Sequence, residues 1–158
     1  MFRKIRKVKN ELSPERTKEI LKKAPRGVLA INGDDGYPYG LPLNYFYDEE
    51  KESFYFHGTK TGYKIDCINK NPKACFTVIL EEEISEDGWS KNTASVVAYG
   101  LVEEIEDQDF ARDAMIKLAK KYYPNMELVD ENMAASFKNT KMLAFHIAYM
   151  TGKRVNER

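Results

Sequence analysis

Cysteine and histidine are scarce in this chain of 158 residues, which contains two of each. Cys67 and Cys75 have a spacing that matches no zinc-binding or Cys-x-x-Cys pattern. Because only His57 and His146 remain as further soft ligands, the sequence predicts no metal site. No secretory signal accompanies the cysteines, so we expect reduced thiols in a cytoplasmic protein.

An excess of charge of one sign and long apolar runs are also missing. The 25 basic side chains equal the 25 acidic ones, which argues against a nucleic-acid-binding protein held by bulk charge. No apolar stretch approaches the length that crosses a membrane. The basic segment at residues 2–9 has no apolar run after it, so we interpret it as a solvated arm.

The chain does contain enough apolar residues for one packed domain spanning residues 1–158. Hydrophobic residues make up 42% of the sequence and aromatic residues 12%. Short apolar runs between turn-forming residues predict six strands, at residues 26–32, 37–47, 53–57, 73–81, 93–105 and 141–151. The first three are joined by short turns, which indicates an antiparallel meander. Pro38 and Pro42 favour an edge or bulged position for the second strand.

Helices are predicted at residues 13–24, 107–122 and 130–139, with a shorter one after Gly62. Ser13 and Asp107 are suitable caps for the first two. We interpret the apolar stripe of residues 107–122 as core packing, and the residues from Gly152 onward as a polar tail. Together these elements predict a mainly β fold with flanking helices, a six-stranded antiparallel barrel. Imperfect alternation along the strands suggests burial on both faces, as where barrels meet in a dimer.

The stretch from Phe54 to Pro72 is the strongest candidate for a binding site. It reads as a strand, a loop rich in glycine, threonine and lysine, and a short helix. The free N–H groups and the dipole at a helix start favour an anion such as phosphate. Candidate contacts, chosen for hydroxyl donors or positive charge, are Thr59, Thr61, Lys60 and Lys64. The alternative is a solvated turn that binds nothing.

Five short motifs occur in a characteristic order over residues 26–100. They are Pro-Leu-Asn-Tyr at Pro42–Tyr45, Phe-Tyr-Phe-His-Gly at Phe54–Gly58, Gly-Tyr-Lys-Ile-Asp at Gly62–Asp66, Asn-Lys-Asn-Pro at Asn69–Pro72, and Ser-Val-Val-Ala-Tyr-Gly at Ser95–Gly100. Together they resemble the pyridoxamine 5′-phosphate oxidase-like FMN-binding proteins, and within that group the nitroimidazole-resistance branch.

The resemblance implies a split β-barrel homodimer that binds two FMN molecules at the subunit interface. The flavin ring would lie along Leu43, Asn44 and Tyr45, mainly against their backbone. The residues that would surround the ribityl phosphate are His57, Gly58, Thr59 and Lys64, with Thr61 nearby. Ser95 and Val96 would flank the flavin from a later strand.

The chain departs from its relatives at two places. Tyr63 stands where some nitroimidazole-resistance relatives carry histidine, so chemistry assigned to that histidine does not transfer. The arginine-rich motifs that grip substrate phosphate in true pyridoxamine phosphate oxidases are missing, and the nearest cationic residues are Lys153 and Arg154.

The first functional hypothesis is therefore an FMN-dependent oxidoreductase that acts on small electron acceptors, with nitro-aromatic compounds as candidates and NAD(P)H as a candidate donor. The flavin would carry the chemistry, so no catalytic side chain is assigned. The alternatives are a non-catalytic flavin carrier or redox sensor, pyridoxamine phosphate oxidase-like activity, or haem binding through His57 or His146. For His146, which has apolar neighbours, we favour a structural role.

Overall fold

A single antiparallel sheet forms the centre of the computed structural model, which describes residues 2–84 and 86–157. Its strands are β1 (Gly27–Asn32), β2 (Pro38–Leu43), β3 (Phe46–Asp48), β4 (Ser53–Thr59), β5 (Lys73–Ile84), β6 (Lys91–Glu104) and β7 (Thr140–Glu157). They lie in the order β2-β1-β5-β6-β7-β4-β3, and every neighbouring pair is antiparallel. The predicted mainly β class is confirmed, although the described residues form seven strands rather than six.

Four α-helices flank the sheet in the described part of the chain: α1 (Pro14–Lys23), α2 (Tyr63–Lys70), α3 (Gln108–Tyr122) and α4 (Met126–Ser136). Short 3₁₀ turns occur at Val8–Asn10, Asp34–Gly36 and Phe137–Asn139. The predicted caps are confirmed, because Ser13 accepts from the N–H of Arg16 and Asp107 from that of Phe110. The predicted helix at 130–139 begins earlier, because the side chain of Asn125 caps α4.

The extra strand arises because the predicted strand at residues 37–47 is interrupted at Asn44 and Tyr45. Its first part, β2, pairs with β1, and its second part, β3, pairs with β4. Since β2 and β3 are the two edges of the sheet, this short connection makes the sheet curl until its edges lie close together. The proline-containing strand β2 is an edge strand, as predicted.

Hydrogen bonds from two helices hold the interruption in place. The N–H of Tyr45 donates to the Tyr122 hydroxyl on α3 at 2.9 Å, and that hydroxyl lies 2.7 Å from the Pro25 carbonyl oxygen, which accepts from it. The Tyr45 hydroxyl donates to the Leu21 carbonyl on α1 at 2.7 Å. The chain between β2 and β3 is therefore tied to both α1 and α3.

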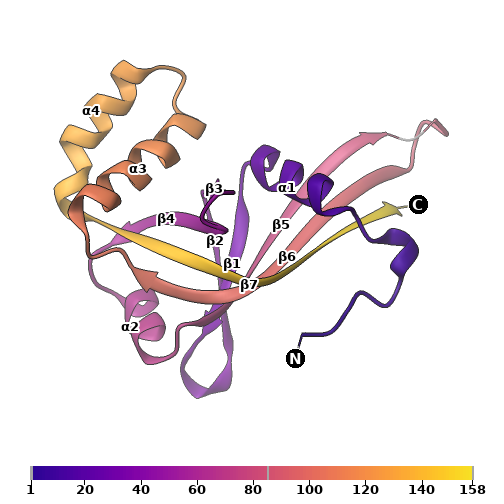
Figure 1. Cartoon of the computed structure of the whole chain (residues 1–158), viewed down its shortest axis with the longest axis horizontal. Helices are drawn as coiled ribbons and strands as arrows, with labels where there is room; N and C mark the ends of the chain where they lie inside the picture. Colours follow the sequence, from indigo (N-terminus) through magenta and orange to yellow (C-terminus); the bar gives the residue numbers. More distant parts are fainter. Residues whose placement is uncertain (1, 85, 158) are drawn as a thin grey trace.

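The structure contains two hydrophobic cores, one on each side of β4. The curled sheet encloses an aromatic cluster that includes Phe54, Phe56 and Phe76. On the other side of β4, Tyr55 packs under α3 and α4, which lie side by side above the sheet (Figure 1). The residues of β4 from Ser53 to Phe56 are therefore buried on both faces within one chain. A dimer is not needed to explain the imperfect alternation of this strand.

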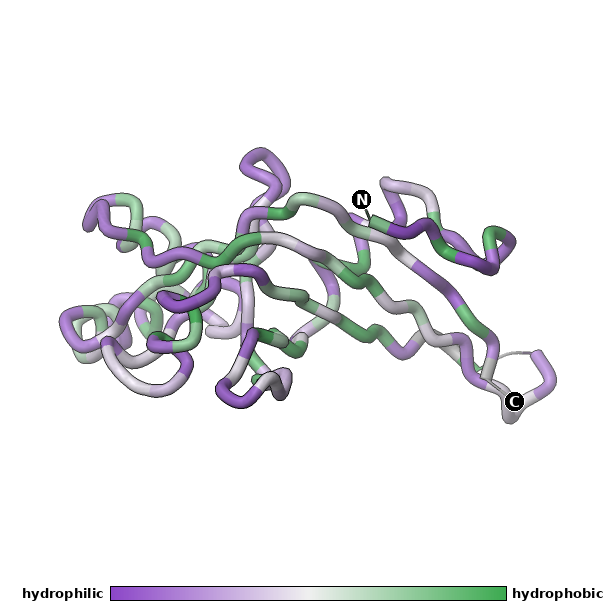
Figure 2. The backbone as a smooth tube through the Cα atoms, turned by 90° about the horizontal axis from the view of Figure 1, so that it is seen from below, coloured by the Kyte–Doolittle hydropathy of each residue, from purple (hydrophilic) through white to green (hydrophobic). Residues whose placement is uncertain are grey.

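The C-terminal residues do not form the polar tail that the sequence predicts. β7 continues through Gly152 to Glu157, because the first half of β6 offers it a ladder partner. Lys153 lies opposite Ser95 in this ladder, and Arg154 lies opposite Ala94. Similarly, β5 extends to Ile84 and β6 begins at Lys91, whereas the predicted strands end at residue 81 and begin at residue 93. Figure 2 shows the extended strands, with apolar residues concentrated along them.

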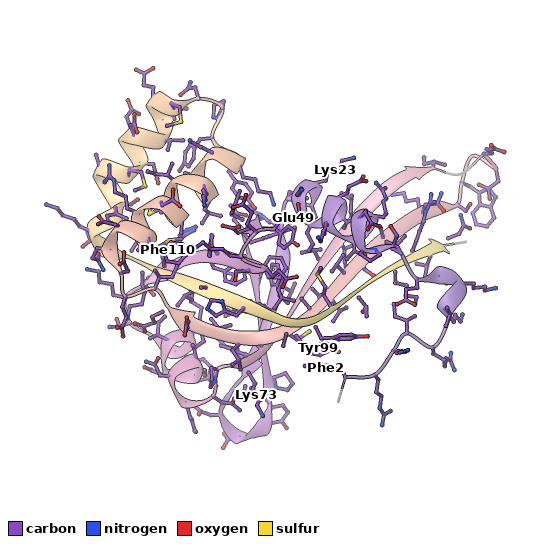
Figure 3. All side chains as sticks on the ribbon, in the orientation of Figure 1. Phe2, Lys23, Glu49, Lys73, Tyr99 and Phe110 are labelled. Carbon is purple, nitrogen blue, oxygen red and sulfur yellow. The ribbon has the colours of Figure 1, made fainter. Side chains whose placement is uncertain are left out.

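The N-terminal arm is not fully solvated, contrary to the sequence-based expectation. The ring of Phe2 stacks on Tyr99 and Tyr149, with centroids 5.4 and 5.1 Å away, and Figure 3 shows Phe2 beside Tyr99. Within the described residues, none of the helices has the length and apolar character needed to cross a membrane.

Gly100 allows the close approach of β6 and β7 at a register shift. A Cβ atom there would clash with the His146 carbonyl oxygen and the Phe145 ring. We expect Gly100→Ala to lower the free energy of unfolding by about 1–3 kcal/mol, measured by urea denaturation followed by circular dichroism. Gly40→Ala is the matched control, because its nearest neighbour, a Val28 methyl group, would be 3.6 Å away. Equal losses in both variants would contradict the close approach.

Candidate functional site

The predicted strand, loop and helix of the candidate anion site are confirmed as β4, the loop at 60–62 and α2. Gly62 begins the helix with a φ of 123°, in the region that favours glycine. The Thr59 hydroxyl closes the loop by donating to the Thr61 carbonyl at 2.8 Å. No side chain caps α2 at Gly62, so the first N–H groups of the helix remain available to a ligand.

Lys64 extends from the first turn of α2 back over Gly58 on β4. A Cβ atom at Gly58 would lie 2.5 Å from the Lys64 ammonium nitrogen, so the missing side chain makes room for this amine. Lys64 is half-buried, and this burial lowers its pKa. None of the acidic side chains in the described residues forms an ion pair with it. A bound anion would supply the missing counter-charge.

His57 is the second polar group at this position. One side of the residue is open to solvent, but its surroundings partly desolvate the ring. This desolvation, followed by the nearby positive charge of Lys64, lowers the pKa of His57. His57 therefore favours its neutral form without a ligand, whereas an anion would favour the charged form.

A cavity of about 380 Å³ opens beside His57, between the sheet and the helices α3 and α4. Two of the site residues predicted from the sequence, Asn44 and His57, line this cavity. The remaining lining residues come from α3, α4 and the segments that follow them: Met115, Leu118, Ala119, Tyr122, Tyr123, Asn132, Ser136 and Thr140. Its size and its mixture of apolar walls with a few polar groups suit a small organic ligand.

Sequence reasoning missed the helical wall of this cavity. The stripe on α3 was interpreted as core packing, and most of its members, such as Leu118, are indeed buried in the second core. Met115, Leu118 and Ala119 belong both to this core and to the wall of the cavity. The available signal was the polar pair Asn132 and Ser136, whose spacing places them on one face of a helix.

The segment Leu43–Tyr45, which the sequence predicts to lie against the flavin ring, already makes several contacts within the protein. Leu43 packs against the interior core, and the backbone N–H and carbonyl of Tyr45 are within hydrogen-bond distance of the Tyr122 hydroxyl. Asn44 accepts from Arg26 Nε at 2.9 Å. Among the described residues no partner accepts from the Asn44 side-chain N–H groups, so they are donors available at the cavity edge.

Ser95 and Val96 do not join the other predicted residues within one chain. Val96 is a buried core residue opposite Gly152 on β7, whereas His57 lies opposite Met142. These two partners are separated by roughly 30 Å along β7 at the usual rise per residue. The predicted site residues therefore form two separate groups in a single chain.

Tyr63 has a structural role on the side of α2 that faces the hairpin of β1 and β2. Its hydroxyl accepts from the N–H of Asp34 at 2.8 Å, and its ring centroid lies 5.0 Å from that of Tyr39. Lys70, at the other end of α2, pairs with the Asp34 carboxylate at 3.3 Å. These contacts fix the orientation of α2 and thereby the position of Lys64.

His146 is bound through both ring nitrogens, consistent with the structural role favoured by the sequence. Its Nδ1 is 3.1 Å from the Ser53 hydroxyl, and its Nε2 is 2.7 Å from a Glu103 carboxylate oxygen. Cys67 and Cys75 are both free thiols. No group of three or more His, Cys, Asp or Glu side chains in the described part of the chain is placed to hold a metal ion.

The fold and site together define a curled antiparallel sheet that carries a strand–helix loop with a half-buried lysine beside a cavity. The sequence model of the family described as pyridoxamine 5′-phosphate oxidase matches residues 13–154. The chain therefore belongs to this family, which confirms the family-level resemblance. Among curated proteins, no sequence matches the chain.

Solved structures with the same fold include three informative relatives. A candidate 5-nitroimidazole antibiotic resistance protein from Bacteroides thetaiotaomicron is 24% identical with a TM-score of 0.77, over 93% of this chain and 87% of that one. The flavocytochrome Anf3 from Azotobacter vinelandii is 20% identical with a TM-score of 0.76, over 95% and 71%. A FAD-binding protein from Mesorhizobium loti is 24% identical with a TM-score of 0.63, over 92% and 96%.

The electrostatic contact between Lys64 and His57 is open to a direct test. Replacing Lys64 by methionine removes the positive charge, so the pKa of His57 should rise towards its ordinary value. The rise should be partial, because desolvation is the larger cause of the lowered pKa. Imidazole resonances followed by NMR across the titration measure the change, with those of His146 as the internal reference. An unchanged His57 midpoint would contradict the contact.

Proposed function

We propose that the chain is a cytoplasmic flavoprotein oxidoreductase that binds FMN and reduces small electron acceptors, with nitro-aromatic compounds as the first class to test. The observation that carries the proposal is Lys64, a half-buried ammonium without an acidic partner among the described residues, placed over Gly58 at an uncapped helix start. Membership of the family and the flavin named in two of the fold relatives support the same cofactor class.

The residues at the anion site fit the phosphate end of FMN. Lys64 would provide the charge, and the first N–H groups of α2 would provide donors. His57, on the other face of β4, would add positive charge nearby as its pKa rises. Thr61 lies in the same loop. Because Gly58 lacks a side chain, the Lys64 ammonium can lie against the strand at this point.

The ring of the flavin would lie against the segment from Leu43 to Tyr45, with Asn44 as the polar contact between ring and cavity. When bound, the isoalloxazine ring supplies the electron-transfer chemistry. The cavity beside His57 would admit the electron acceptor, and the side chains of Met115 and Leu118 would exclude water from it. The protein thus binds and orients the reactants, and no side chain is assigned as a catalytic acid or base.

A second copy of the chain would complete the site. Ser95 and Val96 are too far from His57 to contact the same ligand within one chain. The outer face of β1, β5 and β6 exposes several apolar side chains, namely Val28 (45%), Ile79 (59%), Tyr99 (40%) and Leu101 (48%). An apolar patch on a sheet face fits the contact surface of a homodimer.

The cofactor proposal predicts a yellow purified protein whose released flavin is FMN by chromatography. We expect Lys64→Ala to weaken FMN binding by about 1.5–3 kcal/mol, measured by fluorescence titration of the apoprotein, because a charge-assisted contact is lost. Lys70→Ala is the matched control, since Lys70 lies on the same helix in an exposed ion pair.

A colourless protein that does not take up added FMN would refute the cofactor assignment, and equal affinities in the two variants would place the phosphate elsewhere. Turnover of NAD(P)H with a nitro-aromatic acceptor would distinguish an enzyme from a flavin carrier or redox sensor. A haem Soret band in place of the flavin spectrum would redirect the assignment to His57, since both nitrogens of His146 have partners.

The dimer proposal predicts that Ile79→Asp dissociates the protein into monomers, because it adds a charge to the exposed sheet face. Light scattering coupled to size-exclusion chromatography measures the mass, and the same fractions report flavin content, which should fall with the dimer. Leu128→Asp, at an exposed apolar position on α4, is the control. A wild-type monomer that retains flavin would contradict a site shared between subunits.

A further inference from the structure

A second, smaller cavity adjoins the His57 cavity. It has a volume of about 190 Å³ and lies near the start of α3, where Ala111 and Met142 are among its apolar lining residues. Thr140, at the beginning of β7, lines both cavities and is therefore their common wall. The two cavities therefore lie next to each other at Thr140.

Positive charge is concentrated around the smaller cavity. Three lysines line it, Lys60, Lys138 and Lys141, and no acidic side chain among the described residues does so. Lys141 pairs with Glu104, whereas Lys60 and Lys138 are exposed and have no ion pair among the described residues. The nearby acids Glu106 and Asp107 line a different groove. In a chain of zero net charge, this local excess of positive charge favours an anion.

The lysine cavity and the Lys64 site lie on opposite faces of β4. Successive side chains of a strand point to opposite faces, so Gly58 shares the face of Phe56, in the interior core, while His57 shares the face of Tyr55, under α3. The lysine cavity is on the α3 side, because Ala111 lines it. The two cationic sites are therefore suited to two different anionic groups.

We propose that the lysine cavity binds the anionic group, a phosphate or carboxylate, of the small molecule that exchanges electrons with the flavin. The body of that molecule occupies the His57 cavity, and Thr140 lies between its two parts. This inference rests on the proposed function, and it makes anionic molecules the preferred electron donors or acceptors over neutral ones of the same size.

The test is calorimetric titration of the purified protein, with its flavin, against inorganic pyrophosphate. We expect the double variant Lys60→Gln/Lys138→Gln to raise the dissociation constant tenfold or more. The single variant Lys138→Gln, which leaves the loop at 60–62 intact, should keep its flavin content. The double variant Lys23→Gln/Lys120→Gln makes the same charge change at exposed positions that line neither cavity, and it should bind pyrophosphate like the wild type.

The outcomes separate this inference from the function on which it rests. Equal affinity in all three proteins, or no binding to the wild type, would overturn the lysine cavity as an anion site. Loss of flavin from the Lys138→Gln variant would overturn it as a second site, because the cavity would then hold the flavin's own phosphate. A wild type without flavin would refute the proposed function and with it the role in electron exchange. Titration with pyrophosphate would still test whether the lysine cavity binds an anion.

Discussion

The hydrogen bonds around Tyr45 are the constraint on which the rest of the structure depends. A straight strand through residues 37–47 would leave an open sheet, whereas the interruption at Asn44 and Tyr45 lets one stretch of chain pair with both β1 and β4. The interruption leaves backbone groups without ladder partners, and the Tyr122 hydroxyl accepts from the N–H of Tyr45. The Tyr45 side chain, fully buried among Phe54 and Phe76, anchors the same point in the core.

The same contacts produce the cavity. Because Tyr122 is the last residue of α3, its bond to Tyr45 fixes that end of the helix over the strand interruption. The helix is held farther along by Tyr55, which packs against it from β4. Between these two attachments the sheet and the helix do not close completely, and Asn44 and His57 border the space that remains. Curling of the sheet and formation of the cavity are thus two results of one arrangement.

Features of the site that depend on neighbouring residues in the sequence could be predicted, whereas those that depend on distant residues could not. The strand, loop and helix that carry Gly58 and Lys64 were predictable, because a glycine loop before a helix start is a local pattern. The position of Lys64 over Gly58 was not part of that prediction. The orientation of the Tyr63 side chain was not predictable, since it depends on contact with the hairpin at Asp34. Tyr122 has the spacing of an apolar core position on its helix. Only the folded chain shows that its hydroxyl accepts a hydrogen bond from the N–H of Tyr45. The continuation of β7 past Gly152 likewise depends on β6, which lies far away in the sequence.

A comparison of the two half-buried lysines, Lys64 and Lys121, supports a ligand at the first. Burial lowers the pKa of both, that of Lys121 to about 8. Lys121, however, donates to the Ala24 carbonyl at 2.8 Å and lies 3.7 Å from the centre of the Tyr45 ring, so its ammonium is solvated by the protein. Lys64 has no such partner among the described residues. An ammonium that is partly removed from water without compensation is destabilising, and an arriving anion relieves that cost. The difference between these two lysines is therefore the physical basis for assigning Lys64 to binding and Lys121 to structure.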